Sequence, residues 1–320
     1  MKKLRVVFMG TPEFAVATLD TIRKSGHEVV CVVTTPDKPA GRGRQTRFSD
    51  VKNYALQHGL PLKQPEKLKD DALVEDLRDY LADVFVVVAF RMLPKCIYQI
   101  PPMGTFNVHA SLLPQYRGAA PIQRAIMNGE TMTGVTTFLL DEHTDTGLML
   151  NQTPVPILPG DNAGTLHDKL MVAGAELAVK TLDQLAAGQA KPTPQPIVPD
   201  LKPAPKLFKD DMHIVWDNPA AKILDQIRGL SPYPAAFSLL KSKKPDEKPL
   251  VLKIFDATVS DVESVDKPGR IKLQSTKKMA ISTQDFDIFI NSLQIEGKKR
   301  MKIEEFLKGF HFENYTFFLE

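Results

Sequence analysis

The sequence is poor in cysteine, in net charge and in long apolar runs. Only two of its 320 residues are cysteines, too few for a disulfide framework, and we expect both to be reduced thiols in the core. Lys and Arg number 41 against 38 Asp and Glu, and a net charge of +3 is too small for a protein that packages nucleic acid. No run approaches the roughly 18 apolar residues of a membrane span, and the run at residues 6–9 is too short for a secretion signal. We therefore expect a cytoplasmic protein that does not bind a membrane.

Three motifs of nucleotide and metal chemistry are also missing. The first apolar run ends at Gly10, but Thr11, Pro12 and Glu13 stand where a dinucleotide-binding protein has its glycine-rich turn. The sequence has no G-x-x-x-x-G-K-[ST] loop, and its cysteines and histidines lack the spacing of a zinc site. These absences argue against a nicotinamide or flavin enzyme and against a P-loop NTPase, and we predict no metal.

Strand-like and helix-like segments alternate through residues 1–190. The predicted strands are residues 4–9, 28–34, 60–63, 83–90, 105–109, 133–140 and 149–155. The predicted helices are residues 14–24, with Thr11 as N-cap, then 50–58, 70–81, 120–128 and 163–185. Residues 83–90 are almost continuously apolar, which is typical of a strand buried on both faces. The alternation predicts an α/β domain with a doubly wound, mostly parallel sheet.

The composition changes after residue 190. Six prolines lie within residues 191–206, and this density excludes a helix or a central strand and favours an extended linker. Beyond it we predict helices at residues 219–230 and 303–309 and strands at 235–240, 250–259, 270–273, 278–283 and 285–293. Five short strands with turns between them favour a small β-barrel. We therefore predict a catalytic domain at residues 1–190, a linker at 191–206 and a barrel domain at 207–320.

Asn107 and His109 are the first candidates for chemistry. They are two residues apart on a predicted strand, so their side chains point to the same side. A carboxamide and an imidazole placed together can both donate to a developing oxyanion, and the imidazole can also transfer a proton. Asp145 follows a later strand and is a candidate for orienting His109. Taken alone, the pattern favours an Asn-x-His pair that makes structural hydrogen bonds at the core edge.

A longer pattern surrounds this pair. It reads Asn107-Val108-His109-Ala110-Ser111-Leu112-Leu113-Pro114, then Tyr116-Arg117-Gly118, and later Asp145-Thr146-Gly147. This pattern resembles that of the 10-formyltetrahydrofolate-dependent formyltransferases. The resemblance implies that Asn107, His109 and Asp145 are catalytic and that 10-formyltetrahydrofolate is the cosubstrate. It implies folate contacts from two segments: Ser111, Leu112, Leu113 and Pro114, and Phe90, Arg91, Met92 and Leu93.

Two positions depart from the family pattern. The segment at residues 89–94 is one residue shorter than is usual in the family, and Arg91 lies within it. Leu148 follows Gly147 where the family commonly has an aspartate. The shorter segment implies a pterin pocket reshaped around Arg91.

Two further segments point to one branch of the family. Residues 10–15 and 35–44 resemble the N-terminal segment and the inserted basic loop of the methionyl-tRNA formyltransferases. In that group the loop contacts the acceptor stem of tRNA, which implies tRNA contacts from Lys38, Arg42, Arg44 and Arg47. With Lys52, these residues place five positive charges within 15 residues, and only Asp50 opposes them there. Taken alone, a solvated loop without a partner would have the same composition.

The resemblance implies a Rossmann-like catalytic domain and an OB-like, tRNA-binding C-terminal domain. The expected reaction is formyl transfer from 10-formyltetrahydrofolate to the α-amino group of methionyl initiator tRNA, which supplies translation initiation, and we expect a monomer. Three alternatives stay open on the sequence. They are a formyltransferase for an amino sugar nucleotide or a purine precursor, a hydrolase that releases formate, and a non-catalytic tRNA-binding protein.

Overall fold

The computed structural model describes residues 2–40, 45–244, 246–275 and 277–319, which form two compact units. Each unit is assembled from three stretches of chain. Unit 1 comprises Met1–Pro121, Met132–Pro156 and His167–Ala204, and unit 2 comprises Ile122–Thr131, Ile157–Leu166 and Pro205–Glu320. Neither unit is therefore continuous in sequence, unlike the three consecutive segments that we derived from the sequence. Those domain boundaries stay predictions.

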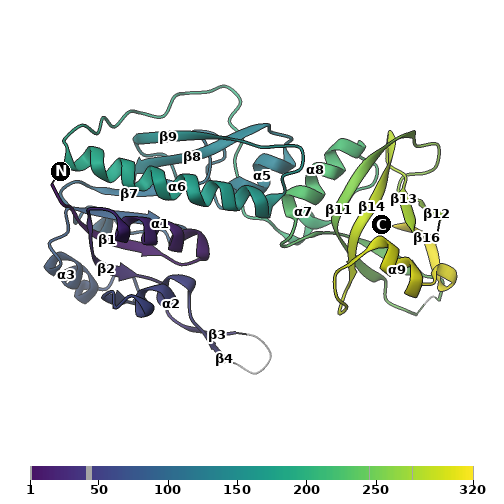
Figure 1. Cartoon of the computed structure of the whole chain (residues 1–320), viewed down its shortest axis with the longest axis horizontal. Coiled ribbons are helices and arrows are strands. Elements are labelled where there is room, and N and C mark those ends of the chain that lie inside the picture. The colour runs from purple at the N-terminus through teal and green to yellow at the C-terminus, as the bar shows by residue number, and fades with distance from the viewer. Residues whose placement is uncertain (1, 41–44, 245, 276, 320) are drawn as a thin grey trace. The chain divides into compact units, whose positions relative to one another are not determined.

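A seven-stranded sheet forms the centre of unit 1 (Figure 1). Its strands are β1 (Arg5–Gly10), β2 (Glu28–Val33), β5 (Leu62–Lys63), β6 (Val84–Val88), β7 (Thr105–His109), β8 (Met132–Leu139) and β9 (Met149–Pro156). The order is β5-β2-β1-β6-β7-β8-β9, with parallel pairing from β5 to β7 and antiparallel pairing from β7 to β9. The predicted mostly parallel sheet is confirmed.

Helices cover both faces of this sheet. They are α1 (Glu13–Lys24), α2 (Asp50–Gln57), α3 (Asp71–Asp79), α4 (Lys95–Tyr98) and α6 (Ala163–Ala186), and the first turn of α6 belongs to unit 2. On one face, alternate residues of β1, β2 and β6 form a buried cluster with Leu73, Val74 and Leu77 of α3 and Ile97 of α4. On the other face α1 and α6 lie side by side (Figure 1), where Phe14 and His167 meet edge-on at 5.3 Å. The sheet is therefore doubly wound, as predicted.

Two local predictions in unit 1 are wrong. Thr11 is not the N-cap of α1, because Pro12 occupies that position and no side chain caps the helix. Cys31 is buried as expected, whereas Cys96 is exposed because it lies on the outer side of the single turn of α4. Neither difference changes the order of the elements.

The strand order of unit 1 reverses between β1 and β6. The chain leaves β1 for β2 on one side and continues from β6 to β7 on the other, and in doubly wound sheets the ligand crevice lies at the carboxyl ends of two such strands. Gly10 ends β1 there, and a Cβ atom at this position would lie 2.6 Å from the Cβ atom of Ala15. The end of β6 continues into Ala89, whose φ is +46°. Ligands of doubly wound proteins bind in such a crevice.

The proline-rich segment, residues 191–206, contains no helix, and the described contacts of Thr193 and Ala204 lie along unit 1. Thr193 and Met149 exchange backbone hydrogen bonds of 2.9 and 2.8 Å. Ala204 pairs with the loop after β7: its N–H donates to the carbonyl of Arg117 at 2.8 Å and its carbonyl accepts from Ala120 at 3.1 Å. The part of the segment up to Ala204 therefore belongs to unit 1.

Unit 2 contains an antiparallel sheet. Its elements are α5 (Pro121–Met127), α7 (Lys209–Met212), α8 (Ala220–Leu230), β10 (Ala236–Ser242), β11 (Leu250–Glu263), β12 (Ile271–Ser275), β13 (Lys278–Ile281), β14 (Phe286–Ile295), β15 (Met301–Lys302), α9 (Ile303–Gly309), η1 (Phe312–Asn314) and β16 (Tyr315–Leu319). The strand order is β12-β13-β14-β11-β10-β16. A bridge between Arg270 and Phe318 joins the two outer strands, so the sheet curls into the predicted barrel. We did not predict β16, although it supplies the strand at which the barrel closes.

The remaining strands, β3 (Lys38–Ala40) and β4 (Gln45–Arg47), pair with each other. No helix in the described part of the chain combines the length and the apolar character that crossing a membrane requires.

Candidate active site

Strand β7 carries Asn107 and His109 at the carboxyl end of the sheet. It lies between β6 and β8, with Asn107 opposite Val87 and Phe138 and with His109 opposite Thr136. His109 is buried and Asn107 is half-buried. Among the described residues we find no hydrogen bond to the Asn107 carboxamide.

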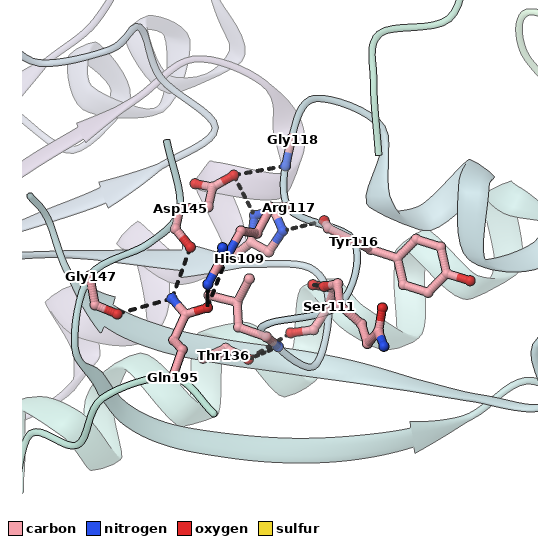
Figure 2. Close-up of polar contacts among 11 residues, drawn as sticks. His109, Ser111, Tyr116, Arg117, Gly118, Thr136, Asp145, Gly147 and Gln195 are labelled. Carbon is pink, nitrogen blue, oxygen red and sulfur yellow. Dashed lines mark hydrogen bonds and ion pairs between the residues drawn. The ribbon is translucent and has the colours of Figure 1, made fainter. Parts of the chain in front are cut away.

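The two ring nitrogens of His109 have different surroundings. Nε2 lies 2.9 Å from the backbone carbonyl of Tyr116, and a carbonyl only accepts, so Nε2 carries a hydrogen and donates it. Nδ1 lies 3.9 Å from Oδ2 of Asp145. A second proton on the ring would therefore sit on Nδ1 and face a carboxylate. Figure 2 shows both contacts, with Nδ1 as the ring nitrogen on the side of Asp145.

Asp145 lies in the turn between β8 and β9, in a conformation with φ at +56°. Its Oδ2 accepts a 2.9 Å hydrogen bond from the backbone N–H of Gly118. Asp141 stabilises the same turn, because its carboxylate accepts from the backbone N–H of His143 and from the hydroxyl of Thr146. The turn thus directs the Asp145 carboxylate toward His109.

Two further residues lie beside Asp145: Arg117, which belongs to the family pattern but was given no role from the sequence, and Gln195, which the sequence did not predict. The guanidinium of Arg117 donates from Nε and Nη2 to Oε1 of Gln195 at 3.1 and 2.6 Å. Nε2 of Gln195 donates to the carbonyls of Asp145 and Gly147 at 2.8 and 3.0 Å (Figure 2). Gln195 lies between Pro194 and Pro196 in a segment that we interpreted as a linker. Thr193 also lies between two prolines, so the sequence held no signal that was specific to Gln195.

The first predicted folate segment forms a rigid loop after β7. The hydroxyl of the fully buried Ser111 donates to the carbonyl of Gln115 at 2.6 Å. The N–H of Leu113 donates to the hydroxyl of Thr136, and its carbonyl accepts from Gln152 at 2.8 Å. Leu112 is half-buried and Pro114 is buried. Their neighbours hold these residues in place, which is the prerequisite for a preformed pocket.

The second predicted folate segment follows β6. Phe90 is half-buried, Met92 is exposed and Leu93 is buried. The guanidinium of Arg91 donates from Nη1 to the carbonyl of Glu66 at 3.0 Å and from Nη2 to that of Pro65 at 2.7 Å. Burial lowers the pKa of Arg91, whose Nε is buried without a partner among the described residues. Arg91 therefore joins the end of β6 to the segment after β5.

The basic segment, residues 38–47, is described only in part. The backbones of Lys38 and Arg47 pair at the ends of β3 and β4, whereas Arg42 and Arg44 lie outside the described residues. Lys52 does not add a free charge to this segment. Its ammonium is 2.5 Å from Oδ2 of Asp37 and 3.9 Å from the centre of the Phe48 ring. The bond from Lys52 is the main cause of the lowered pKa of Asp37.

Comparison with known proteins identifies the family. A profile described as "Formyl transferase" matches residues 2–182, and one described as "Formyl transferase, C-terminal domain" matches residues 206–311. The chain belongs to the formyl transferase family. The family predicted from the residues around β7 is therefore confirmed, and so is the prediction of a formyl-transferring enzyme.

Curated relatives resemble this formyltransferase over nearly its whole length. A Bacteroides fragilis protein named "Methionyl-tRNA formyltransferase" is 48% identical over 316 residues, 97% of each chain. A Flavobacterium johnsoniae protein of the same name is 46% identical over 98% of each chain. Among solved structures, an N-formyltransferase from Helicobacter canadensis is 20% identical with a TM-score of 0.66, over 90% of this chain and 98% of that one. That likeness supports the fold alone.

Within the described ranges, no group of three or more His, Cys, Asp or Glu side chains is placed to hold a metal ion.

Proposed function

We propose that this protein transfers the formyl group of 10-formyltetrahydrofolate to the α-amino group of methionyl initiator tRNA. The observation that carries the proposal is the arrangement of His109 between the Tyr116 carbonyl and Asp145, with the Asn107 carboxamide two residues away on β7. The near full-length relatives named methionyl-tRNA formyltransferase support the choice of acceptor.

Asn107, His109 and Asp145 act together on the formyl carbonyl. As the amine attacks, a C–N bond forms and negative charge develops on the formyl oxygen, to which the Asn107 amide and the protonated Nδ1 of His109 donate. Each such donor contributes roughly 3 kcal/mol of transition-state stabilisation. Asp145 stabilises the imidazolium. The bond from the formyl carbon to the folate nitrogen then breaks as Nδ1 of His109 gives its proton to that nitrogen, and the neutral Nδ1 takes up the proton that the amine loses.

The two loops beside the crevice bind the cosubstrate. The folded state already holds the loop at residues 111–114 by hydrogen bonds of Ser111 and Leu113 to Thr136 on β8 and of Leu113 to Gln152 on β9. The second segment, Phe90, Arg91, Met92 and Leu93, follows the adjacent strand. A pocket formed before the ligand arrives lowers the entropic cost of binding. The cosubstrate itself supplies only the activated formyl group.

The basic segment binds the acceptor end of the tRNA through Lys38, Arg42, Arg44 and Arg47, because these residues can neutralise phosphates. The OB-like barrel of unit 2 supplies further tRNA contacts. We further propose that the protein acts as a monomer in the cytoplasm.

Formyl transfer by the purified protein tests the proposal. We expect rapid formylation of methionyl initiator tRNA and much slower formylation of methionyl elongator tRNA. An amino sugar nucleotide and a purine precursor with a free amine serve as competing acceptors, and formate release without an acceptor measures hydrolysis. Faster transfer to either small molecule, or release of formate as the main reaction, would replace the proposed function.

A further inference from the structure

The hydrogen bonds around Asp145 lead outside the three predicted catalytic residues. We propose that Gln195 is a positioning residue for formyl transfer, which holds Asp145 beside His109 without touching either substrate. The inference rests on the proposed function, because the reaction it concerns is that transfer. Gln195 belongs to the proline-rich segment, at a distance of 50 residues in sequence from Asp145.

The carboxamide of Gln195 can have only one orientation. Its oxygen faces the two donors of Arg117, and its NH₂ group faces the carbonyls of Asp145 and Gly147. The reversed amide would place NH₂ against a guanidinium and oxygen against two carbonyls, so every contact would be repulsive. Both donors and the acceptor oxygen are used. Glutamate has the same size but lacks the two donors.

Asp145 needs such support because its backbone is in the left-handed region, which costs about 1–2 kcal/mol for a residue other than glycine. Gln195 binds the carbonyls on either side of Thr146 and so stabilises the turn in this shape. The same network reaches the side chain of Asp145. Arg117 binds Gln195, and the next residue, Gly118, donates its N–H to Oδ2 of Asp145. The backbone and the carboxylate of Asp145 are therefore held by one connected set of bonds.

The segment that carries Gln195 is anchored on both sides of it. Thr193 pairs with Met149 on β9, and further along the segment the carbonyl of Lys202 accepts from the N–H of Tyr116 at 2.7 Å. Tyr116 is also the residue whose carbonyl binds His109. Pro194 and Pro196 fix φ on either side of Gln195 and reduce the freedom of the unbound segment. The segment thus positions both partners of His109.

Steady-state formylation of methionyl initiator tRNA by Gln195→Ala, Gln195→Glu and Ile197→Ala tests this role. Ile197 is fully exposed in the same segment and makes Ile197→Ala the matched control. We expect kcat to fall roughly 10- to 100-fold in both Gln195 variants, because displacement of a catalytic group by about 1 Å costs up to 10²-fold. The KM values for both substrates stay within about twofold, and the control matches the wild type. Gln195→Glu keeps the packing if Gln195→Ala fails to fold.

A double-mutant cycle separates positioning from general structural support. In an Asp145→Asn background, measured by single turnover with excess enzyme, Gln195→Ala should lower the rate by less than about threefold, because the two residues act through the same group. An equal loss in both backgrounds, a higher KM with unchanged kcat, or unchanged kinetics of both Gln195 variants would overturn the inference. A wild-type protein that does not formylate the tRNA would instead refute the proposed function.

Discussion

The loops around His109 and the basic segment at residues 38–47 are built in opposite ways. Around His109, backbone carbonyls, a carboxylate and a carboxamide are bound to one another over four separate stretches of chain. The described part of the basic segment is a pair of short strands, β3 and β4, and four of the ten residues in its sequence are Lys or Arg. Charge is its main feature.

This difference matches what each region has to do. Chemistry requires a donor to be placed within fractions of an ångström, so the catalytic residues need many bonds from the fold. Contact with phosphates depends on long-range attraction that tolerates several geometries and falls with salt. We therefore expect substitutions in the first region to change kcat and those in the second to change KM and its salt dependence.

His109→Ala should have the largest effect and most directly tests the role of the first region. Loss of the proton carrier and of one donor to the oxyanion lowers kcat by about 10²- to 10⁴-fold. The lost hydrogen bond to the Tyr116 carbonyl costs only about 1 kcal/mol of stability. Single-turnover formylation and thermal unfolding measure the two quantities.

His143→Ala is the matched control, because His143 is exposed in the turn that contains Asp145. It should leave kcat unchanged. A His109→Ala protein with kcat within a few-fold of the wild type would mean that the loops around His109 are not the catalytic region.

Gly118→Ala should disturb the same region through the backbone. Gly118 has φ at +123°, and a Cβ atom there would lie 2.4 Å from the carbonyl oxygen of Ala204. The strain costs about 1–3 kcal/mol before the clash is counted. It also moves the N–H that binds Asp145, so we expect kcat to fall by roughly tenfold or more together with the melting temperature.

Gly188→Ala separates strain from displacement. Gly188 has a similar requirement, with φ at +66°, but a Cβ atom added there would meet no atom of the described residues within 4 Å. This variant should lose about 1 kcal/mol of stability with normal kcat. If Gly118→Ala behaved in the same way, the contact with Ala204 would be irrelevant to catalysis.

The comparison also shows where sequence reasoning succeeds. The strand at residues 105–109 and the helix at 303–309 were predicted with the observed bounds, because their apolar patterns and flanking turns are local. Gln195 was missed because its bonds go to backbone carbonyls 48 and 50 residues away, which leave no periodic pattern. β16 was missed because the barrel, not its own residues, selects its pairing with β10.

Charge was the less reliable part of the site prediction. Five positive residues were counted near the basic segment, but Lys52 is bound to Asp37, which lies just before the counted span. Pairing depends on the fold, so a count of charges overestimates what is free to bind a phosphate.

Arg42→Ala and Arg44→Ala therefore test the second region. Each should raise KM for methionyl-tRNA several-fold and lower the slope of log KM against log salt by about 1, while kcat and the KM for the folate stay unchanged. Lys52→Ala should leave the slope unchanged, because its ammonium is already paired. An altered folate KM in either Arg variant would show that the segment shapes the pocket instead.

Arg91→Lys should have the smallest effect. It tests whether the folate loops depend on hydrogen bonds, as the loops around His109 do. The planar guanidinium binds the carbonyls of Pro65 and Glu66 at once, and an ammonium on a flexible stem does not reproduce that fork. Loss of about one hydrogen bond, or roughly 1 kcal/mol, should raise the KM for 10-formyltetrahydrofolate about fivefold.

Lys95→Ala, which removes only an exposed ion pair with Glu142, is the control. Because Arg91 acts through backbone geometry, the effect should be independent of salt and the KM for tRNA unchanged. A salt-dependent change in tRNA affinity would instead place Arg91 with the basic segment.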